Sequence, residues 1–318
     1  MKFQLFDSEP FLRVIESVYD LTRVAVLPPG VEGSFAFFRS NKPLRGRELF
    51  ALPFGYYRTA QDLRERWTAN QWQAVKRYSA EHRCNITMTV LGEASFDDGV
   101  LCAHNPVLSL NTGQPAGERY TRNLRLNLKK EWNKCERHGI HIEFTQREDD
   151  LRAFYRVLAT QYVREHRMVF QPFNLFQRLL ALEGAARLLV ARSDEHGVVG
   201  GLFMLCDGPV LHYNWGARLQ VANVSVGTVL IDHAVRHAEQ SGYQHFNFGS
   251  TALSDRNLLD FKLKWGCENV PVYRYHTLTR PADVDLASSY GAARWLFSRL
   301  PVEVAAAMMP VVSPWLIR

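Results

Sequence analysis

The order of extended and helical patterns in the second half of the sequence restricts the fold more than any other feature. Apolar residues alternate over residues 140–144, as in a half-buried strand, and recur at helical spacing over residues 151–162. Three strand-like segments then follow one another, and Asp207-Gly208 between the last two is a strong hairpin signal. A doubly wound sheet alternates single strands with helices, so this run of strands indicates another kind of mixed α/β fold.

The complete predicted order of this half is β-α-α-β-β-β-α-β-α-β. The predicted strands cover residues 140–144, 188–191, 198–206, 210–215, 245–249 and 272–278, and the predicted helices cover residues 151–162, 173–182, 226–240 and 258–265. Gly242 stands where the C-terminal cap of the third helix is expected. This order resembles the topology of the GNAT acyltransferases, and that resemblance implies an α/β fold with an α+β mixed sheet.

The first half resembles the same topology more loosely, without a sequence repeat between the halves. Strands are predicted at residues 3–6, 34–38, 48–53, 86–91 and 106–110, and helices at residues 60–82 and 121–137. We therefore expect two tandem GNAT-like acyltransferase domains with a C-terminal helical tail. The expected divisions are residues 1–138 for the N-terminal domain, 139–280 for the C-terminal domain and 281–318 for the tail.

The tail is amphipathic, but it is too short and too interrupted by proline to span a bilayer. One hypothesis places it on a membrane surface, with Arg294, Arg299 and Arg318 near lipid phosphates. The alternative is that the tail packs against its own domain or against a partner subunit.

Three stretches of the sequence resemble the FemAB family of aminoacyltransferases. The first is Leu52-Pro53-Phe54-Gly55-Tyr56, and the second is Asn123-Leu124-Arg125 within a basic helix. The third is the most specific: Phe246-Asn247-Phe248-Gly249-Ser250 is followed by Phe261-Lys262 and then by Trp265-Gly266. Asn247 stands where the family commonly has aspartate, so a role that needs a carboxylate does not carry over to this position.

The resemblance implies acyl or aminoacyl transfer to a cell-envelope precursor of peptidoglycan or exopolysaccharide. The acceptor amine attacks the donor carbonyl directly, since the sequence has no G-x-S-x-G elbow for a covalent intermediate. No tightly bound cofactor is expected, and acyl-CoA or aminoacyl-tRNA serves as co-substrate. The alternative is a non-catalytic binding or scaffold protein of a polysaccharide assembly system that shares the fold.

The catalytic candidates lie where the resemblance places a gap between two parted strands. Backbone N–H groups in such a gap stabilise the oxyanion of an acyl transfer. Lys262 is the first candidate, because the resemblance assigns the lysine of Phe-Lys to the oxyanion or the leaving atom; otherwise it is a solvated helix lysine. Tyr213 and Asn214 are candidates for protonating the leaving group and for orienting the acceptor, or else they are ordinary strand residues.

Donor binding is expected at a helix N-terminus and at the end of a parted strand. The start of a helix binds anions through its free N–H groups. However, the stretch before the helix at 226–240 has one glycine and no leading Gln or Arg, which disfavours ordinary acetyl-CoA binding. The donor-binding candidates are Ser225, Gly227, Thr228, Phe248, Gly249 and Ser250.

The acceptor is expected between the two domains, held by aromatic and basic side chains. Arg122 and Arg125 are three residues apart on one helix face, and arginine is well suited to bind phosphate. Tyr56 and Arg58 would join them from the first domain. For the two helix residues, the alternative is the solvated outer face of an amphipathic helix.

The net charge and the cysteines indicate where the protein is located and what kind of partner it binds. Net charge is +6, which suits anionic ligands or serves solubility alone. The five cysteines lack C-x-x-C spacing, so a reducing compartment is expected, and no metal site is predicted. We expect a cytoplasmic protein, with peripheral contact at the inner face of the membrane as an extension. The expected partners are a small-molecule or lipid-linked envelope precursor and, as a further candidate, tRNA.

Overall fold

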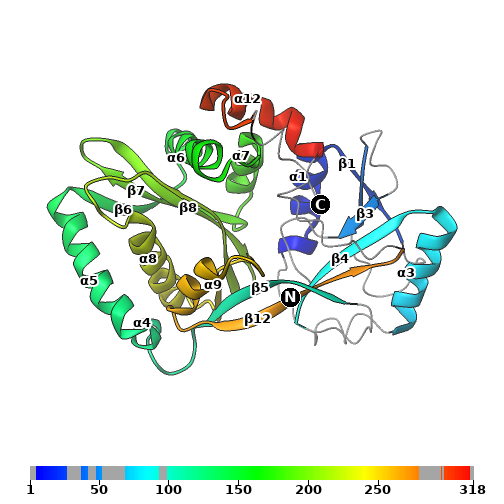
Figure 1. Cartoon of the computed structure of the whole chain (residues 1–318), viewed down its shortest axis with the longest axis horizontal. Helices are drawn as coiled ribbons and strands as arrows, with labels where there is room; N and C mark the ends of the chain where they lie inside the picture. Colours follow the sequence, from blue (N-terminus) through cyan, green and yellow to red (C-terminus); the bar gives the residue numbers. More distant parts are fainter. Residues whose placement is uncertain are drawn as a thin grey trace.

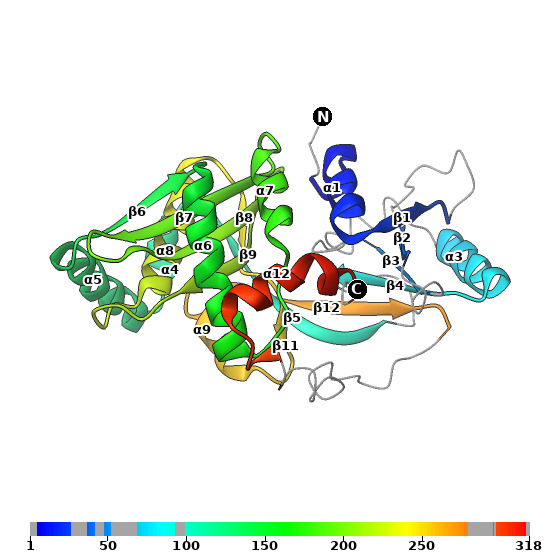
Figure 2. The same ribbon diagram turned by 90° about the horizontal axis from the view of Figure 1, so that it is seen from above.

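The structure is a computed structural model that describes residues 5–26, 37–41, 48–51, 69–92, 99–278, 295 and 297–315 of the 318-residue chain. Its described strands form a single 12-stranded mixed sheet that runs through the length of the molecule. Helices cover both faces of this sheet (Figures 1 and 2).

The first half of the chain supplies one end of the sheet and the helices around it. Its elements are η1 (Leu5–Asp7), α1 (Glu9–Tyr19), β1 (Leu21–Val24), β2 (Phe37–Ser40), β3 (Glu48–Ala51), α3 (Ala69–His82), β4 (Asn85–Leu91), β5 (Val100–Ser109), α4 (Ala116–Arg119) and α5 (Arg122–Arg137).

The second half supplies the other end of the sheet and the tail. Its elements are β6 (Ile140–Thr145), α6 (Glu148–Gln161), η2 (Tyr162–His166), α7 (Phe173–Ala181), β7 (Ala186–Ser193), β8 (Gly197–Asp207), β9 (Val210–Arg218), α8 (Val226–Gln240), β10 (His245–Asn247), β11 (Thr251–Ala252), α9 (Arg256–Leu263), β12 (Glu268–His276), α12 (Val302–Val312) and η3 (Ser313–Trp315).

The two halves exchange strands at the centre of the sheet. The strand order is β1-β2-β3-β4-β12-β5-β10-β9-β8-β7-β6, with β11 paired to β5. The last strand of the second half, β12, therefore lies between β4 and β5, while β5 of the first half lies between β12 and β10. Figure 1 shows this crossing, where orange β12 runs into the end of the sheet that carries cyan β4.

The sheet order also shows a repeat that the sequence does not. In the first half, β3 and β4 are parallel and α3 joins them. In the second half, β9 and β10 are parallel and α8 joins them. Antiparallel strands precede each parallel pair, two in the first half and three in the second, and an exchanged strand follows it. The element order thus supports a duplicated architecture, as predicted.

Two hydrophobic cores lie on opposite faces of the sheet in the second half. One core contains buried residues of α1, α6, α7 and α12 and extends into the first half, where it reaches Trp72 of α3. The other contains buried residues of α4, α5 and α8 together with Trp265 after α9. The two faces are visible in Figure 1, with α6, α7 and α12 above the sheet and α8 and α9 below it.

Most predicted elements of the second half are confirmed, and the clearest error lies at the N-terminus. The predicted helix at 226–240 begins and ends as α8 does. The strand predicted at 3–6 is wrong over Leu5 and Phe6, which begin η1. Leu5 N–H donates to Asp207 Oδ1 at 2.7 Å, and the Ser8 hydroxyl donates to Leu5 O at 2.7 Å, so the chain turns here.

This turn leads into α1, which was not predicted although its start signals are present. The Ser8 side chain caps the helix by accepting a hydrogen bond from Phe11 N–H, and Pro10 lies in its first turn. Elsewhere, the predicted strand at 106–110 is the end of the longer β5, and the helix predicted at 60–82 is described only from Ala69 onward. Residues 60–68 lie outside the described part of the chain.

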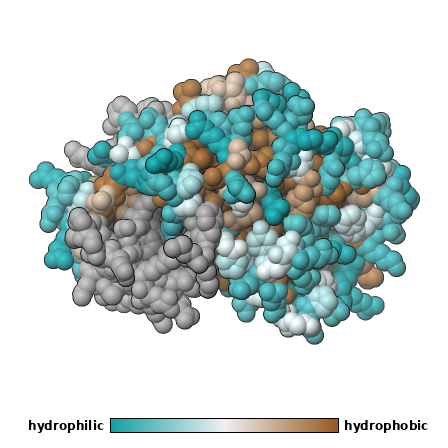
Figure 3. All heavy atoms as spheres, turned by 180° about the vertical axis from the view of Figure 1, so that it is seen from behind, coloured by the Kyte–Doolittle hydropathy of each residue, from teal (hydrophilic) through white to brown (hydrophobic). Residues whose placement is uncertain are grey.

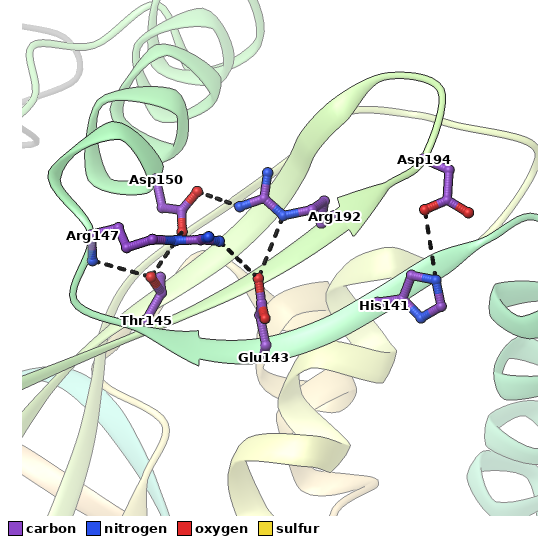
Figure 4. A network of polar contacts seen from close by, with 7 residues as sticks. All are labelled: His141, Glu143, Thr145, Arg147, Asp150, Arg192 and Asp194. Carbon is purple, nitrogen blue, oxygen red and sulfur yellow. Dashed lines mark hydrogen bonds and ion pairs between the residues drawn. The ribbon is translucent and has the colours of Figure 1, made fainter.

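A charged network fixes the N-terminus of α6 to strands β6 and β7 (Figure 4). Asp150 accepts hydrogen bonds from Thr145 at 2.8 Å, from Arg147 at 2.7 Å and from Arg192. Burial acts to raise the pKa of Asp150, but these three hydrogen bonds outweigh it and lower that pKa. Because its partners span three elements, this carboxylate orients the helix on the edge of the sheet.

The described part of the tail contains a helix, as expected, and this helix, α12, packs on α6 and α7. Among the described residues, none of the helices has both the length and the apolar character needed to cross a bilayer.

Candidate active site

The parallel strands β9 and β10 part near the centre of the sheet. Their pairing ends at His212 and Asn247, although β9 continues to Arg218. A β-bulge in β9 follows at once, because Met204 pairs with Tyr213 while Phe203 pairs with Trp215. Asn214 is the extra residue of that bulge. The ladder between the two strands therefore ends beside Tyr213 and Gly249, and the strands part there, as the sequence predicted for this pair.

Lys262 reaches the end of β10 from the neighbouring helix α9. Its Nζ donates hydrogen bonds to Gly249 O at 2.9 Å and to Ser250 O at 3.3 Å. The side chain is 6% exposed, so it is not a solvated lysine. Burial lowers its pKa to about 8, against smaller opposing effects of Cys267 and Asp255. Lys262 therefore places an ammonium group with a lowered pKa beside the parted strands, and shifted pKa values of this kind are typical of functional sites.

Gly249 allows the close approach at this point. It adopts φ +74°, a left-handed conformation, and a Cβ atom built on it would lie 3.2 Å from Tyr213 O. Its N–H donates to Asn247 Oδ1 at 2.8 Å. Gly249 thus brings the turn after β10 next to the backbone of Tyr213, and Lys262 of α9 bonds to Gly249 and Ser250 of the same turn.

Tyr213 and Asn214 both lie at the bulge but have different surroundings. Burial raises the pKa of Tyr213 to about 12; Tyr162 adds to this effect and Arg218 opposes it. Its hydroxyl group lies over Gly216, where a Cβ atom would meet it at 2.2 Å. The side-chain oxygen of Asn214 is buried and accepts no hydrogen bond from the residues described. A buried amide oxygen without a donor is suited to receive an N–H from a bound acceptor.

Phe248 contributes packing to this region. It is 2% exposed and packs against Phe246 and Trp265, with ring centroids 5.0 and 5.9 Å away. Its side chain is therefore part of the core, so contact with a donor would have to come from its backbone.

Asn247 is the centre of a buried polar network that the sequence analysis did not identify. Its Oδ1 accepts from Asn105 Nδ2 at 2.9 Å, and its Nδ2 lies 3.2 Å from His212 Nδ1. His212 Nε2 lies 3.7 Å from Asp207 Oδ2. The network connects β5, β10, β9 and β8 directly behind the point where the strands part. An amide both donates and accepts here, which an ionised carboxylate cannot do.

The N-terminus of α8 already holds an internal anion. Glu131 Oε2 of α5 accepts a hydrogen bond from Ser225 N–H at 2.6 Å, and its Oε1 accepts from Lys134 Nζ at 2.8 Å. Burial acts to raise the pKa of Glu131, but the hydrogen bonds from Lys134 and Ser225 outweigh it and lower that pKa. The carboxylate is therefore ionised near neutral pH and occupies the position where a helix favours negative charge.

The other predicted residues at the start of α8 are only partly accessible to a donor molecule. The hydroxyl groups of Ser225 and Thr228 lie 2.8 Å apart and bond to each other, and Thr228 is 6% exposed. Gly227 is covered by Arg218, since a Cβ atom there would lie 3.2 Å from Arg218 Cδ. Arg218, which sequence reasoning missed, thus brings a cation to the helix start at the end of β9.

Two of the four predicted acceptor residues, Arg122 and Arg125, lie within the described part of the chain. Arg122 and Arg125 lie on the exposed face of α5, and neither forms an ion pair with another residue in the described ranges. Thr121 N–H donates to Lys264 O at 2.9 Å, so the start of α5 is tied to the end of α9. Tyr56 and Arg58 lie outside the described residues.

Within the described ranges, no group of three or more His, Cys, Asp or Glu side chains is placed to bind a metal ion. All five cysteines are free thiols.

Comparison with known protein families identifies the central part of the chain. Residues 122–262 match the model of the acetyltransferase (GNAT) domain. This range includes α5, the parted strands and Lys262. A search among curated proteins finds no match to the sequence.

Solved structures extend the likeness over most of the chain. The C-terminal domain of a protein assigned as a lysylphosphatidylglycerol synthetase from Agrobacterium fabrum has a TM-score of 0.58 at 14% identity, over 90% of this chain and 92% of that one. FemX gives 0.58 at 13% identity, over 86% and 90%. L-PGS from Bacillus licheniformis gives 0.56 at 14% identity, over 91% and 93%.

At these identities the likeness shows a common fold. Together with the domain match, it confirms the expectation of a FemAB-like arrangement of GNAT domains in a mixed α/β sheet.

Proposed function

Because the chain contains a GNAT acyltransferase domain within the fold of FemX, we propose that it transfers an acyl or aminoacyl group to the amine of a cell-envelope precursor. The observation that carries this proposal is Lys262, a buried cation held beside the parted ends of β9 and β10. The proposed acceptor is a precursor of peptidoglycan or exopolysaccharide synthesis. The proposed location of the protein is the cytoplasm. The names of two similar structures, FemX and L-PGS, are compatible with envelope chemistry.

The proposed reaction is a direct transfer. The lone pair of the acceptor nitrogen attacks the donor carbonyl carbon, and a tetrahedral oxyanion forms. Backbone N–H groups of the parted strands and the Lys262 ammonium stabilise this negative charge, an effect worth about 3–4 kcal/mol per well-placed donor. The C–O or C–S bond of the donor then breaks, and the proton of the attacking nitrogen passes to the departing oxygen or sulfur atom.

Glu131 favours a donor without a diphosphate at the start of α8. The Glu131 carboxylate accepts the hydrogen bond of the Ser225 N–H. It thereby places a negative charge where acetyl-CoA enzymes bind pyrophosphate. Two anions at one helix start repel each other. We therefore favour an aminoacyl-tRNA over an acyl-CoA as the donor, because its reactive ester does not require a diphosphate at this helix start.

The rival proposal is a binding or scaffold protein with the same fold, and one observation favours it. Lys262 Nζ is already bonded to two backbone carbonyl groups, which is also how a lysine with a purely structural role would look.

Replacement of Lys262 separates the two proposals. Lys262→Met keeps the apolar stem but removes the charge, whereas Lys264→Met changes an exposed lysine on the same stretch and serves as the matched control. Both variants are assayed with radiolabelled aminoacyl-tRNAs and acyl-CoAs against envelope precursors, and their folding is checked by circular dichroism. For an enzyme, we expect product formation to fall about 100-fold in Lys262→Met alone. Absence of product from the wild-type protein with all of these donors would instead support the scaffold, and equal rates of product formation by folded Lys262→Met and the wild type would show that Lys262 is not catalytic.

A further inference from the structure

The helix α12 exposes an apolar stripe to solvent. Val304, Met308 and Val311 lie on one face at spacings of four and three residues, and they are 45%, 41% and 69% exposed. Trp295, just before this helix, is 57% exposed. The opposite face of α12 is occupied, because Ala305 and Met309 are buried in the core with α6 and α7. The helix is thus anchored on one side and apolar on the other.

The surface view is consistent with this placement. In Figure 3, apolar residues gather along the upper edge of the molecule, the edge on which Figure 1 places α12. Scattered apolar side chains are normal on a protein surface, but a stripe along one helix face marks a surface for interaction.

Basic side chains accompany the stripe. The Arg299 guanidinium lies 4.4 Å from the centre of the Trp295 ring, and Arg164 Nη1 donates to Ser298 O at 3.0 Å. Neither arginine forms an ion pair with another residue among those described. Residues 294–318 contain Arg294, Arg299 and Arg318 but only one acidic residue, Glu303. Arg299 and Arg164 therefore bring positive charge to the end of the stripe that lies next to Trp295.

The size of the stripe argues against a second copy of the chain as its occupant. The helix has 11 residues and is therefore only about 16 Å long. A stable protein interface buries roughly 800 Å² on each partner, which one face of so short a helix does not supply. Shallow insertion into a lipid surface needs less area, and it favours tryptophan with arginine at the boundary of the apolar region.

We propose that α12 with Trp295 docks the protein on an anionic membrane surface. Val304, Met308 and Val311 enter the boundary between headgroups and acyl chains, while Arg164 and Arg299 contact lipid phosphates. This inference goes beyond acyl transfer and holds for an enzyme or a scaffold alike. It would place the protein on the surface where lipid-linked precursors lie.

Binding to lipid vesicles tests the proposal with the full chain. Sedimentation is measured with vesicles of phosphatidylglycerol and phosphatidylcholine in equal amounts, and with phosphatidylcholine alone. We expect binding to the anionic vesicles that weakens as salt increases. Met308→Asp combined with Val311→Asp should lower the partition coefficient about tenfold or more. Arg299→Gln should lower it about fivefold, the equivalent of about 1 kcal/mol for one basic residue at the surface.

The matched controls lie on α5. Leu126→Asp changes a side chain that is 61% exposed, and Arg137→Gln changes an exposed arginine. Both should bind vesicles as the wild type does. Failure of the wild-type protein to bind anionic vesicles at low salt overturns the proposal, as does equal binding by the folded α12 double variant. A concentration-dependent dimer that the double variant abolishes, seen in analytical ultracentrifugation, would assign the stripe to a second copy instead.

Discussion

At the residue scale, the surroundings of Lys262 set the charge that it carries at a given pH. An exposed lysine is protonated throughout the physiological range, whereas burial lowers the pKa of this one to about 8. Two backbone carbonyl groups then hold its Nζ at the end of β10. The side chain therefore changes charge at a pH close to 8.

This pKa predicts the pH dependence of the reaction. If the ammonium stabilises the oxyanion, product formation should fall as pH rises through about 8, because the lysine loses its proton there. Lys262→Arg keeps the charge and should move this falling limb to higher pH. Single-turnover rates between pH 6 and 10 measure both profiles. A rate that rises through pH 8 in the wild type but not in Lys262→Arg would show that the neutral amine of Lys262 acts as a base instead.

Sequence reasoning found Lys262 and the parted strands because their motif is local. It missed Glu131, whose partner Ser225 is 94 residues away in the chain. The available signal was a glutamate in the apolar stripe of Leu124, Leu128 and Cys135, since a charge on a buried face needs a partner. The partners of Asn247 come from β5 and β9, so only the folded sheet brings them together.

At the element scale, α6 packs tightly on the sheet at a glycine of β8. A Cβ atom on Gly201 of β8 would lie 2.7 Å from Leu189 O and 2.7 Å from the Phe154 ring. The first of these contacts is to the backbone of the neighbouring strand β7, which cannot move without distorting the sheet. The absence of a side chain here therefore lets α6 pack on β8.

Gly201→Ala should consequently destabilise the protein. We expect the free energy of unfolding to fall by about 1–3 kcal/mol, the usual cost of overpacking a core. Urea unfolding followed by circular dichroism gives this value. Gly117→Ala in α4 is the control, since its nearest neighbour would be 3.9 Å away. A loss of stability as large in Gly117→Ala as in Gly201→Ala would show that packing at β8 is not the cause.

Periodic elements with clear end signals were predictable, and elements defined by distant partners were not. The helix α8 has a continuous apolar face and ends before Gly242, so both its limits could be predicted. β5 and β12 each begin before the predicted strands, because partners from the other half of the chain prolong their pairing at that end. A local pattern carries no information about such pairing.

At the scale of the whole molecule, the exchanged strands make the two halves depend on each other. β12 forms ladders with both β4 and β5 of the first half. The division at residues 138 and 139 remains a prediction from sequence. Separation of the chain there would leave β12 in one fragment and both of its partners in the other.

We therefore expect fragments 1–138 and 139–318 to be unfolded or aggregated alone and to form a complex when they are expressed together. Size-exclusion chromatography and circular dichroism of the separate and co-expressed fragments test this. The intact chain should unfold in a single transition, because neither half completes its sheet without the other. A monomeric, cooperatively folded fragment 139–318 would contradict the expectation.

The same exchange has a consequence for biosynthesis. Ribosomes make β5 long before β12, since β5 ends at Ser109 and β12 begins at Glu268. At cellular elongation rates, this interval lasts on the order of 10–30 s. Throughout that time β4 and β5 of the nascent chain lack their central partner and present open edges to other chains. Translation speed and chaperone supply should therefore govern the yield of this protein more than the stability of its finished fold.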